Sequence, residues 1–175
     1  MVRSIELLKK WNTSALLDYF LQHPTKKIHA GLLDKELKIY RKGILDGLRE
    51  LLKAGLLGME EAGRTKQYSL NRSNPVVKQL KILLNLDRVM PLLEKLKGSG
   101  VEVYLYGSCA RGEDMEDSDI DLLFIGNLKR TEVLGKFGGM EKLAAIYFTF
   151  LEYSALARKD KAFYERLEKD RIRLM

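Results

Sequence analysis

The chain has 175 residues, 46% of them apolar, with 31 Lys+Arg against 24 Asp+Glu and a formal net charge of +7. No apolar run reaches the roughly 18 residues of a membrane span, so we expect a globular protein of one or two domains with no membrane partner. Charges interrupt the apolar residues of the N-terminus, unlike a secretory signal peptide, and we expect a cytoplasmic protein. One cysteine and two histidines exclude an internal disulfide and a zinc site built from Cys and His alone.

Charge is divided unevenly along the chain. Residues 1–97 carry 19 Lys+Arg against 10 Asp+Glu, a net +9, whereas residues 98–175 carry 12 against 14, a net −2. A basic half suits an anionic partner such as nucleic acid, although lysine-rich surfaces often serve only solubility. Net charge leaves both interpretations open.

Three helices and a hairpin are predicted in the basic half. Apolar residues recur at helical spacing from Ser14, a good N-cap, to Gln22. Further helices fit residues 30–38 and 40–55, and residues 56–70 fit two short strands joined by a turn at residues 62–64. The third helix should bury one apolar stripe, made of Ile44, Leu45, Leu48, Leu51 and Leu52.

The stretch from Leu16 to Leu70 resembles the winged helix-turn-helix regulators, in the run IHAGLLDKELKIYRKGILDGLRELLKAGLL followed by GRTKQYSLN. In that family the third helix enters the major groove of DNA, and the wing contacts the backbone or the minor groove. The alternatives are a solvated helix face, or a fold of this kind used only for protein contacts. The resemblance implies duplex DNA contacts from Tyr40, Arg41, Lys42 and Arg49 of the third helix and from Arg64 and Lys66 of the wing.

Two features of the basic half leave questions for the structure. Gly43 and Gly47 lie inside the third helix, where each costs roughly 1 kcal/mol relative to alanine, so either a close backbone approach or tolerated weakness must explain them. Residues 73–97 then form a helical connector in which Pro75 suits a first turn and Pro91 predicts a break or a second start. The connector is too apolar to be exposed, so it packs between domains or forms a homodimer interface.

The acidic half begins with two predicted strands. Residues 101–107 alternate apolar and polar or aromatic side chains and end in a Gly-Ser turn, and residues 118–126 form the second strand after a polar, helix-compatible segment. On a strand, Asp119 and Asp121 point to one face while Ile120 and Leu122 point to the core. Two carboxylates side by side repel each other unless a cation lies between them.

Such a pair suits a hard divalent ion. Mg²⁺ (or Mn²⁺) takes one or two carboxylates and completes its shell with water and substrate phosphates. Gly107 allows the backbone to approach a phosphate, and the Ser108 hydroxyl and nearby N–H groups can bond its oxygens at the start of a helix. The segment therefore predicts a site for a nucleoside triphosphate held between turn and metal. Cys109, inside the turn, is predicted to pack rather than to act as a nucleophile.

The spacing Gly-Ser, ten residues, Asp-x-Asp, with ARG and SDIDLL in place, closely resembles the minimal nucleotidyltransferases of the DNA polymerase beta superfamily. The resemblance is strong from Val101 to Gly126 and weak onward to Met175. It implies a mixed sheet flanked by helices, and a metal on Asp119 and Asp121. It also implies that a triphosphate contacts Gly107, Ser108, Arg111 and Ser118.

Members of the superfamily that transfer nucleotides usually place a third carboxylate on the next strand. Here that strand is predicted at residues 145–153, and only Glu152 at its end is placed to reach the metal. Because Glu152 shares its side of the strand with Ile146, Phe148 and Phe150, which should be buried, we expect no third acid at the site. The remaining charges up to Met175 predict a closing helix with a solvated face and a short terminal strand.

The sequence thus predicts a mixed α/β chain with a winged helix at residues 1–72, a helical connector at residues 73–97 and a minimal nucleotidyltransferase domain at residues 98–175. The combination resembles prokaryotic regulators and antitoxin-like proteins. One hypothesis is a transferase that moves a nucleoside monophosphate from a triphosphate to a hydroxyl, for example on a partner protein. The other is a DNA-binding regulator whose degenerate transferase domain senses nucleotide or holds a toxin-like partner.

Overall fold

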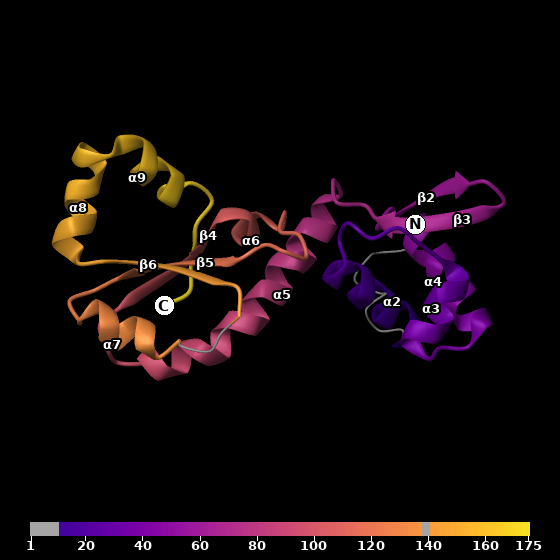
Figure 1. The fold of residues 1–175 in the computed structure, drawn as a ribbon, viewed down its shortest axis with the longest axis horizontal. Helices are drawn as coiled ribbons and strands as arrows, with labels where there is room; N and C mark the ends of the chain where they lie inside the picture. Colours follow the sequence, from indigo (N-terminus) through magenta and orange to yellow (C-terminus); the bar gives the residue numbers. More distant parts are fainter. Residues whose placement is uncertain (1–10, 138–140) are drawn as a thin grey trace. The chain divides into compact units, whose positions relative to one another are not determined.

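The computed structural model describes residues 11–137 and 141–175. The chain divides into two compact units, Met1–Leu80 and Lys81–Met175, and each unit contains one of the two sheets (Figure 1). The boundary falls within helix α5 (Pro75–Leu93). Among the described residues, no helix combines the length and the apolar character that crossing a membrane requires.

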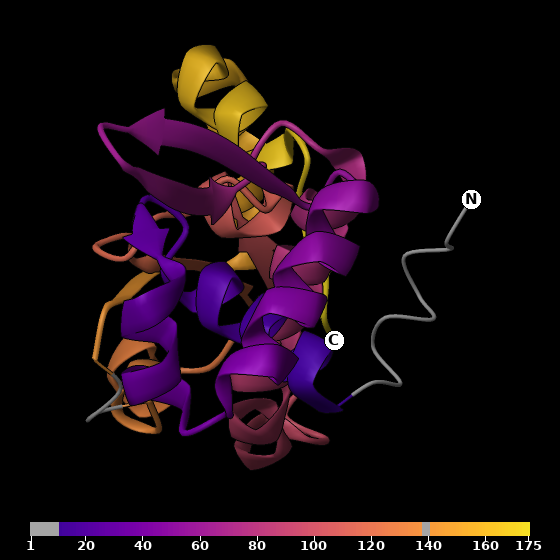
Figure 2. The ribbon, with the colours of Figure 1, turned by 90° about the vertical axis from the view of Figure 1, so that its right-hand side faces the viewer.

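In the part that the structure describes, the N-terminal unit combines three helices before the hairpin with a small antiparallel sheet. The helices are α2 (Trp11–Gln22), α3 (Ala30–Leu37) and α4 (Arg41–Lys53). The strands are β1 (Ile28–His29), β2 (Leu57–Ala62) and β3 (Thr65–Leu70), in the order β1-β3-β2. Figure 2 shows the β2–β3 hairpin along one side of the helices of this unit. The three predicted helices and the hairpin are confirmed.

Two details of the predicted helices were wrong. Ser14 is not an N-cap, because it lies inside α2 and its hydroxyl donates to the carbonyl of Trp11 at 3.0 Å. Leu45 is 40% exposed, whereas Ile44, Leu48 and Leu51 are fully buried. Leu45 follows Ile44 by about 100° around the helix, which places it on the solvent side of the stripe.

The glycines of α4 are explained by close packing against α2. A Cβ atom added to Gly47 would lie 2.5 Å from Leu16 Cδ1 and 3.5 Å from Thr13 Cα. A Cβ atom added to Gly43 would lie 2.6 Å from Asn12 Nδ2. Close approach, and not tolerated weakness, therefore accounts for both residues.

The C-terminal unit is built on a mixed four-stranded sheet in the order β6-β5-β4-β7. Strand β4 is antiparallel to β5 and to β7, whereas β5 and β6 are parallel. The predicted mixed sheet with flanking helices is confirmed. The strands are β4 (Glu102–Tyr106), β5 (Ile120–Ile125), β6 (Leu143–Phe148) and β7 (Ile172–Arg173).

Helices cover both faces of this sheet, which explains why β5 is apolar almost throughout. One core lies between the sheet and α5, the short helix α6 (Gly107–Arg111) and α7 (Arg130–Gly135). The other contains Tyr104, Tyr106, Leu123 and Ile125 and packs against α8 (Phe150–Lys159) and α9 (Lys161–Glu168). Figure 1 shows α8 and α9 on one side of β4, β5 and β6, and α7 on the other.

Four further predictions need correction. Helix α5 does not break at Pro91 but continues to Leu93, and a 3₁₀ turn follows at Glu94–Leu96. Because Pro91 lies close to the C-terminal end of the helix, it removes only one helical hydrogen bond. The strand predicted at residues 145–153 is β6, which ends at Phe148 because Thr149 caps α8. Phe150, expected to be buried, is exposed. The closing helix is in fact two helices, α8 and α9.

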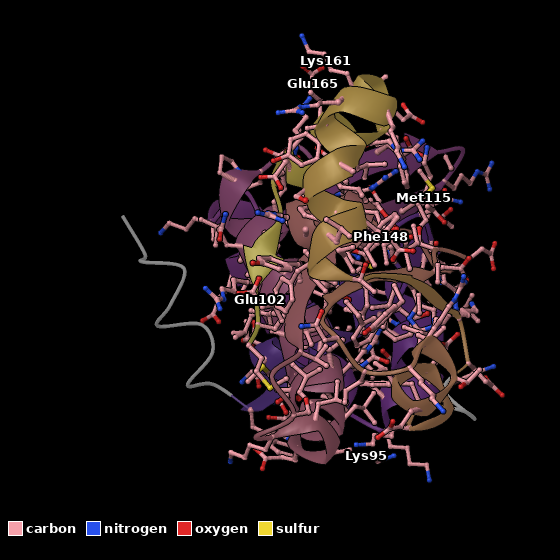
Figure 3. All side chains as sticks on the ribbon, turned by 90° about the vertical axis from the view of Figure 1, so that its left-hand side faces the viewer. Lys95, Glu102, Met115, Phe148, Lys161 and Glu165 are labelled. Atoms are coloured by element: carbon pink, nitrogen blue, oxygen red, sulfur yellow. The ribbon has the colours of Figure 1, made fainter. Side chains whose placement is uncertain are left out.

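The outer side of α9 is a solvated face, as predicted. Lys161 and Glu165 lie one helical turn apart with 3.7 Å between Nζ and Oε1, and both are exposed. Figure 3 shows these two side chains at the outer end of the helix, away from Phe148 of β6. Exposed pairs of this kind contribute little to stability.

Candidate active site

The Gly-Ser turn lies where β4 ends. Tyr106 has an extended backbone, and the chain then turns at Gly107, which has a φ of +71° and is the first residue of α6. The helix ends after one turn at Gly112, which has a φ of +64°. Because L-residues rarely adopt positive φ, glycine is favoured at both ends of this short helix.

Gly107 lies directly against the second aspartate of the Asp-x-Asp pair. Antiparallel pairing of β4 with β5 sets Tyr106 opposite Asp121, which brings the carboxyl group beside the turn. A Cβ atom on Gly107 would overlap Asp121 Oδ2 and would lie 3.0 Å from Asp121 Cγ. Any side chain at position 107 would therefore displace this carboxylate.

The two aspartates differ in exposure, and the charge of Asp119 affects Asp121. Asp119 is exposed and immediately precedes β5, and Asp121 is half-buried. Ile120 lies between the two aspartates and Leu122 follows them. As expected, both are buried in the core on the α5 side of the sheet. Burial raises the pKa of the Asp121 carboxyl, and the neighbouring charge of Asp119 raises it further. The site thus disfavours two bare carboxylates and favours a proton or a cation.

Two arginines counter this effect. The charges of Arg111 and Arg166 lower the pKa of Asp121, although each has a smaller effect than burial, which raises it. Arg111 lies in α6, and its Nε donates to Glu113 Oε2 at 3.0 Å. Arg166 comes from α9, where its guanidinium lies 4.8 Å from the centre of the Phe163 ring. Arg166 is not among the predicted site residues, because no local pattern relates a helix near the C-terminus to the Asp-x-Asp strand.

The two predicted serines have different surroundings. Ser108 is half-buried, and its hydroxyl makes no hydrogen bond to another residue in the described part of the chain. The Ser118 oxygen accepts a bond from the Met115 amide at 2.8 Å, and the Ser118 amide donates to the Met115 carbonyl at 3.1 Å. Ser118 therefore shapes the loop before β5, whereas the Ser108 hydroxyl is available to a ligand.

Cys109 packs, as predicted. Its side chain is buried, and its thiol donates to the Asp119 carbonyl at 3.4 Å. Burial raises the pKa of the thiol to about 12, helped by the charges of Asp114 and Asp121. Since the thiolate is the nucleophilic form, a thiol that ionises so late is a poor nucleophile near neutral pH.

Among the described residues, no third carboxylate joins the pair. Parallel pairing sets Ala144 of β6 opposite Asp121, and the same face of β6 continues with Ile146 and Phe148. Within residues 11–137 and 141–175, no three His, Cys, Asp or Glu side chains group as metal ligands. Glu152, the predicted candidate, belongs to α8 and accepts bonds from the Thr149 amide at 2.8 Å and its hydroxyl at 2.9 Å. These bonds lower the pKa of Glu152.

The six residues predicted to contact DNA all lie on the surface of the N-terminal unit. Tyr40 is 68% exposed, immediately before α4. Arg41 pairs with Asp34 at 3.0 Å and Arg49 with Asp46 at 3.1 Å, so two of the basic residues already contact carboxylates. The other three, Lys42 of α4 and Arg64 and Lys66 at the hairpin, are exposed.

Comparison with known proteins supports the assignment of the C-terminal half. Residues 86–172 match the family model described as "Nucleotidyltransferase domain". Residues 86–172 are therefore similar to nucleotidyltransferase domains. A solved structure of a candidate nucleotidyltransferase from Sulfolobus solfataricus is 22% identical, with a TM-score of 0.39, over 58% of this chain and 88% of that one. A search of curated proteins finds no match.

Proposed function

We propose that the C-terminal unit binds a nucleoside triphosphate together with Mg²⁺ (or Mn²⁺) and transfers its nucleoside monophosphate to a hydroxyl acceptor. The observation that carries this proposal is the contact between the Gly107 turn and the Asp121 carboxylate. A turn that only glycine can make, held against a half-buried acid, has little value for packing alone. It sets a place for phosphate oxygens beside a place for a cation.

Asp119 and Asp121 would hold the metal. Their oxygen donors and mutual repulsion fit a hard divalent cation, which favours grouped carboxylates. When bound, such an ion neutralises phosphate charge and polarises the phosphorus centre. The Ser108 hydroxyl and the amides of the turn would donate to the phosphate oxygens. Arg111 and Arg166 would add positive charge on the same side.

One observation favours a second candidate function. The face of β6 beside Asp121 carries Ala144, Ile146 and Phe148, so it offers no carboxylate to receive the proton of an acceptor hydroxyl. A domain of this kind would bind nucleotide but turn it over slowly. The second candidate is therefore a regulator in which the nucleotide is sensed, or in which the domain holds a partner protein such as a toxin-like protein.

For the N-terminal unit we propose a winged helix that binds duplex DNA. Support comes from the order helix, strand, two helices and hairpin, from the β1-β3-β2 sheet, and from the net charge of +9 over residues 1–97. Lys42, Arg64 and Lys66 would contact DNA directly. Arg41 and Arg49 would leave their ion pairs with Asp34 and Asp46 and bind phosphates instead. Breaking these pairs would lose little free energy, because exposed ion pairs contribute about 0–1 kcal/mol.

The deciding experiment incubates the full chain with each of the four labelled triphosphates and Mg²⁺ or Mn²⁺, alone and with candidate acceptor proteins or nucleic acids. Label transferred to a macromolecule supports the transferase. Saturable, metal-dependent binding without transfer supports the nucleotide-sensing regulator. Absence of both binding and transfer for all four nucleotides contradicts the transferase and the nucleotide-sensing regulator, and leaves only a domain that holds a partner protein.

A further inference from the structure

Three polar side chains are buried together beside the candidate active site. Lys81 and Asn85 lie one turn apart on the same side of α5 and are only 4% and 2% exposed. Asp114 is 8% exposed and lies in the loop between α6 and β5, where it contacts both Lys81 and Asn85. The Lys81 Nζ atom is 2.9 Å from Asp114 Oδ2, and the Asn85 amide donates to Asp114 Oδ1 at 3.0 Å.

Asn85 also connects this group to the phosphate turn. The same Nδ2 atom donates to the carbonyl of Cys109 at 3.2 Å, inside α6 and next to Ser108. Cys109 in turn donates its thiol hydrogen to the carbonyl of Asp119. One turn of α5 therefore holds both the short helix that follows Gly107 and the loop that leads to the aspartates.

Stability alone is a poor reason for this arrangement. Removing a lysine and an aspartate from water is unfavourable, and well-packed apolar residues of similar volume often replace a buried ion pair without loss of stability. A hydrogen-bonded ion pair differs from an apolar contact in fixing direction and distance. Here the bonds of Asp114 and Asn85 hold the loop between Gly112 and Asp119 in a fixed position relative to α6.

We propose that Lys81, Asn85 and Asp114 are positioning residues for nucleotide binding, which set the phosphate turn and the metal-binding aspartates at the spacing that a metal-bound triphosphate requires. The inference rests on the proposed function of the site. None of the three side chains needs to touch the ligand. Their effect is to limit how far α6 and the loop before β5 can move apart.

The test replaces the ion pair with an apolar pair, Lys81→Met with Asp114→Leu, in the full chain. Binding of a nucleoside triphosphate and of the corresponding monophosphate is measured with Mg²⁺ by calorimetry, and folding by thermal melting. We expect a melting temperature close to that of the unchanged protein. We also expect the preference for triphosphate over monophosphate, as a ratio of Kd values, to fall at least tenfold. This ratio does not depend on the folded fraction, so a merely structural role would leave it unchanged.

The matched control is the exposed pair of Lys97 and Glu94, also 2.9 Å apart, changed to Met and Leu. It should leave the ratio unaltered. If the buried apolar pair does not fold, Asn85→Ala carries the same test, because it breaks the link to Cys109 while leaving Lys81 and Asp114 paired. An unaltered ratio in a folded variant overturns the positioning role alone. Failure of the unchanged protein to bind triphosphate overturns the proposed function, and the positioning role with it.

Discussion

Glycine makes room for a neighbour in both units of this protein, but the neighbours differ. In α4, Gly43 and Gly47 make room for Asn12 and Leu16 of α2, and both glycines have ordinary helical backbones. At the end of β4, Gly107 has a positive φ and makes room for the Asp121 carboxylate. The first arrangement brings two helices together, whereas the second brings a backbone turn to a charged group.

This difference separates packing from chemistry. Replacing a glycine that makes room for a packed side chain, as Gly47 does for Leu16, changes stability and involves no ligand. Gly107 instead keeps a backbone turn close to a half-buried carboxylate. These two groups do not stabilise each other unless a cation and a phosphate are bound. Substitutions in the two units should therefore change different measurements.

The largest effect is expected from Gly107→Val. The backbone strain at positive φ costs about 1–2 kcal/mol, and the added side chain also displaces Asp121, so metal-dependent triphosphate binding should fall below detection by calorimetry. Gly98→Val is the matched control, because Gly98 has a φ of +72° and nothing within 4 Å of an added Cβ atom. Equal loss of binding in both variants would show that strain, and not the carboxylate contact, is responsible.

Ser108→Ala should have a smaller effect. It removes one hydrogen bond to a charged phosphate, about 1.5–3 kcal/mol, which weakens triphosphate binding by roughly 10- to 150-fold. The melting temperature without ligand should stay the same, since the hydroxyl has no partner in the described residues. A greater loss than that of Gly107→Val would contradict the role of the backbone turn.

In the N-terminal unit, Gly47→Ala should lower stability without affecting nucleotide binding. Overpacking against Leu16 costs about 1–3 kcal/mol, and the higher helix propensity of alanine returns about 1 kcal/mol. Gly43→Ala should be close to neutral, because the Asn12 amide can swing aside. Denaturant unfolding of the full chain measures both, and the packing account fails if Gly47→Ala is the more stable of the two.

The smallest effects concern DNA. Arg64→Ala and Lys66→Ala should each reduce the slope of log affinity against log salt by about 0.9, the value for one lost phosphate contact. Lys42→Ala should change the preference among sequences if that side chain contacts a base edge. Fluorescence anisotropy with duplex DNA at several salt concentrations measures these slopes. Slopes that match the unchanged protein would point to a protein-contact role for this unit.

Local patterns predicted most of the fold. The helices, the hairpin and the strands around Gly107 follow from periodicity and turn residues, because each depends on neighbours in the sequence. The end of β6 also had a local signal, since Thr149 and Glu152 form the Thr-x-x-Glu pattern of a capping box. The capping box is a better guide here than the apolar run, which predicts a longer strand.

The rest of the site depends on contacts between distant segments. The charge of Arg166 acts on Asp121 only because α9 packs on the face of β5 that carries Asp121. Lys81 meets Asp114 across 33 residues of sequence, and a lysine among the apolar residues of α5 gives no sign of its partner. The exposure of Leu45 was not predictable either, because a stripe of five apolar residues does not show which edge meets solvent.

The most direct test of the central claim is calorimetric titration of the Asp119→Asn/Asp121→Asn double variant with nucleoside triphosphate, with and without Mg²⁺. The account predicts that Mg²⁺-dependent binding disappears. It also predicts an equal or higher melting temperature without ligand, because the raised pKa of Asp121 means that its ionised form destabilises the fold near neutral pH. Binding that keeps the Mg²⁺ dependence of the unchanged protein would contradict the assignment of these aspartates as the metal site.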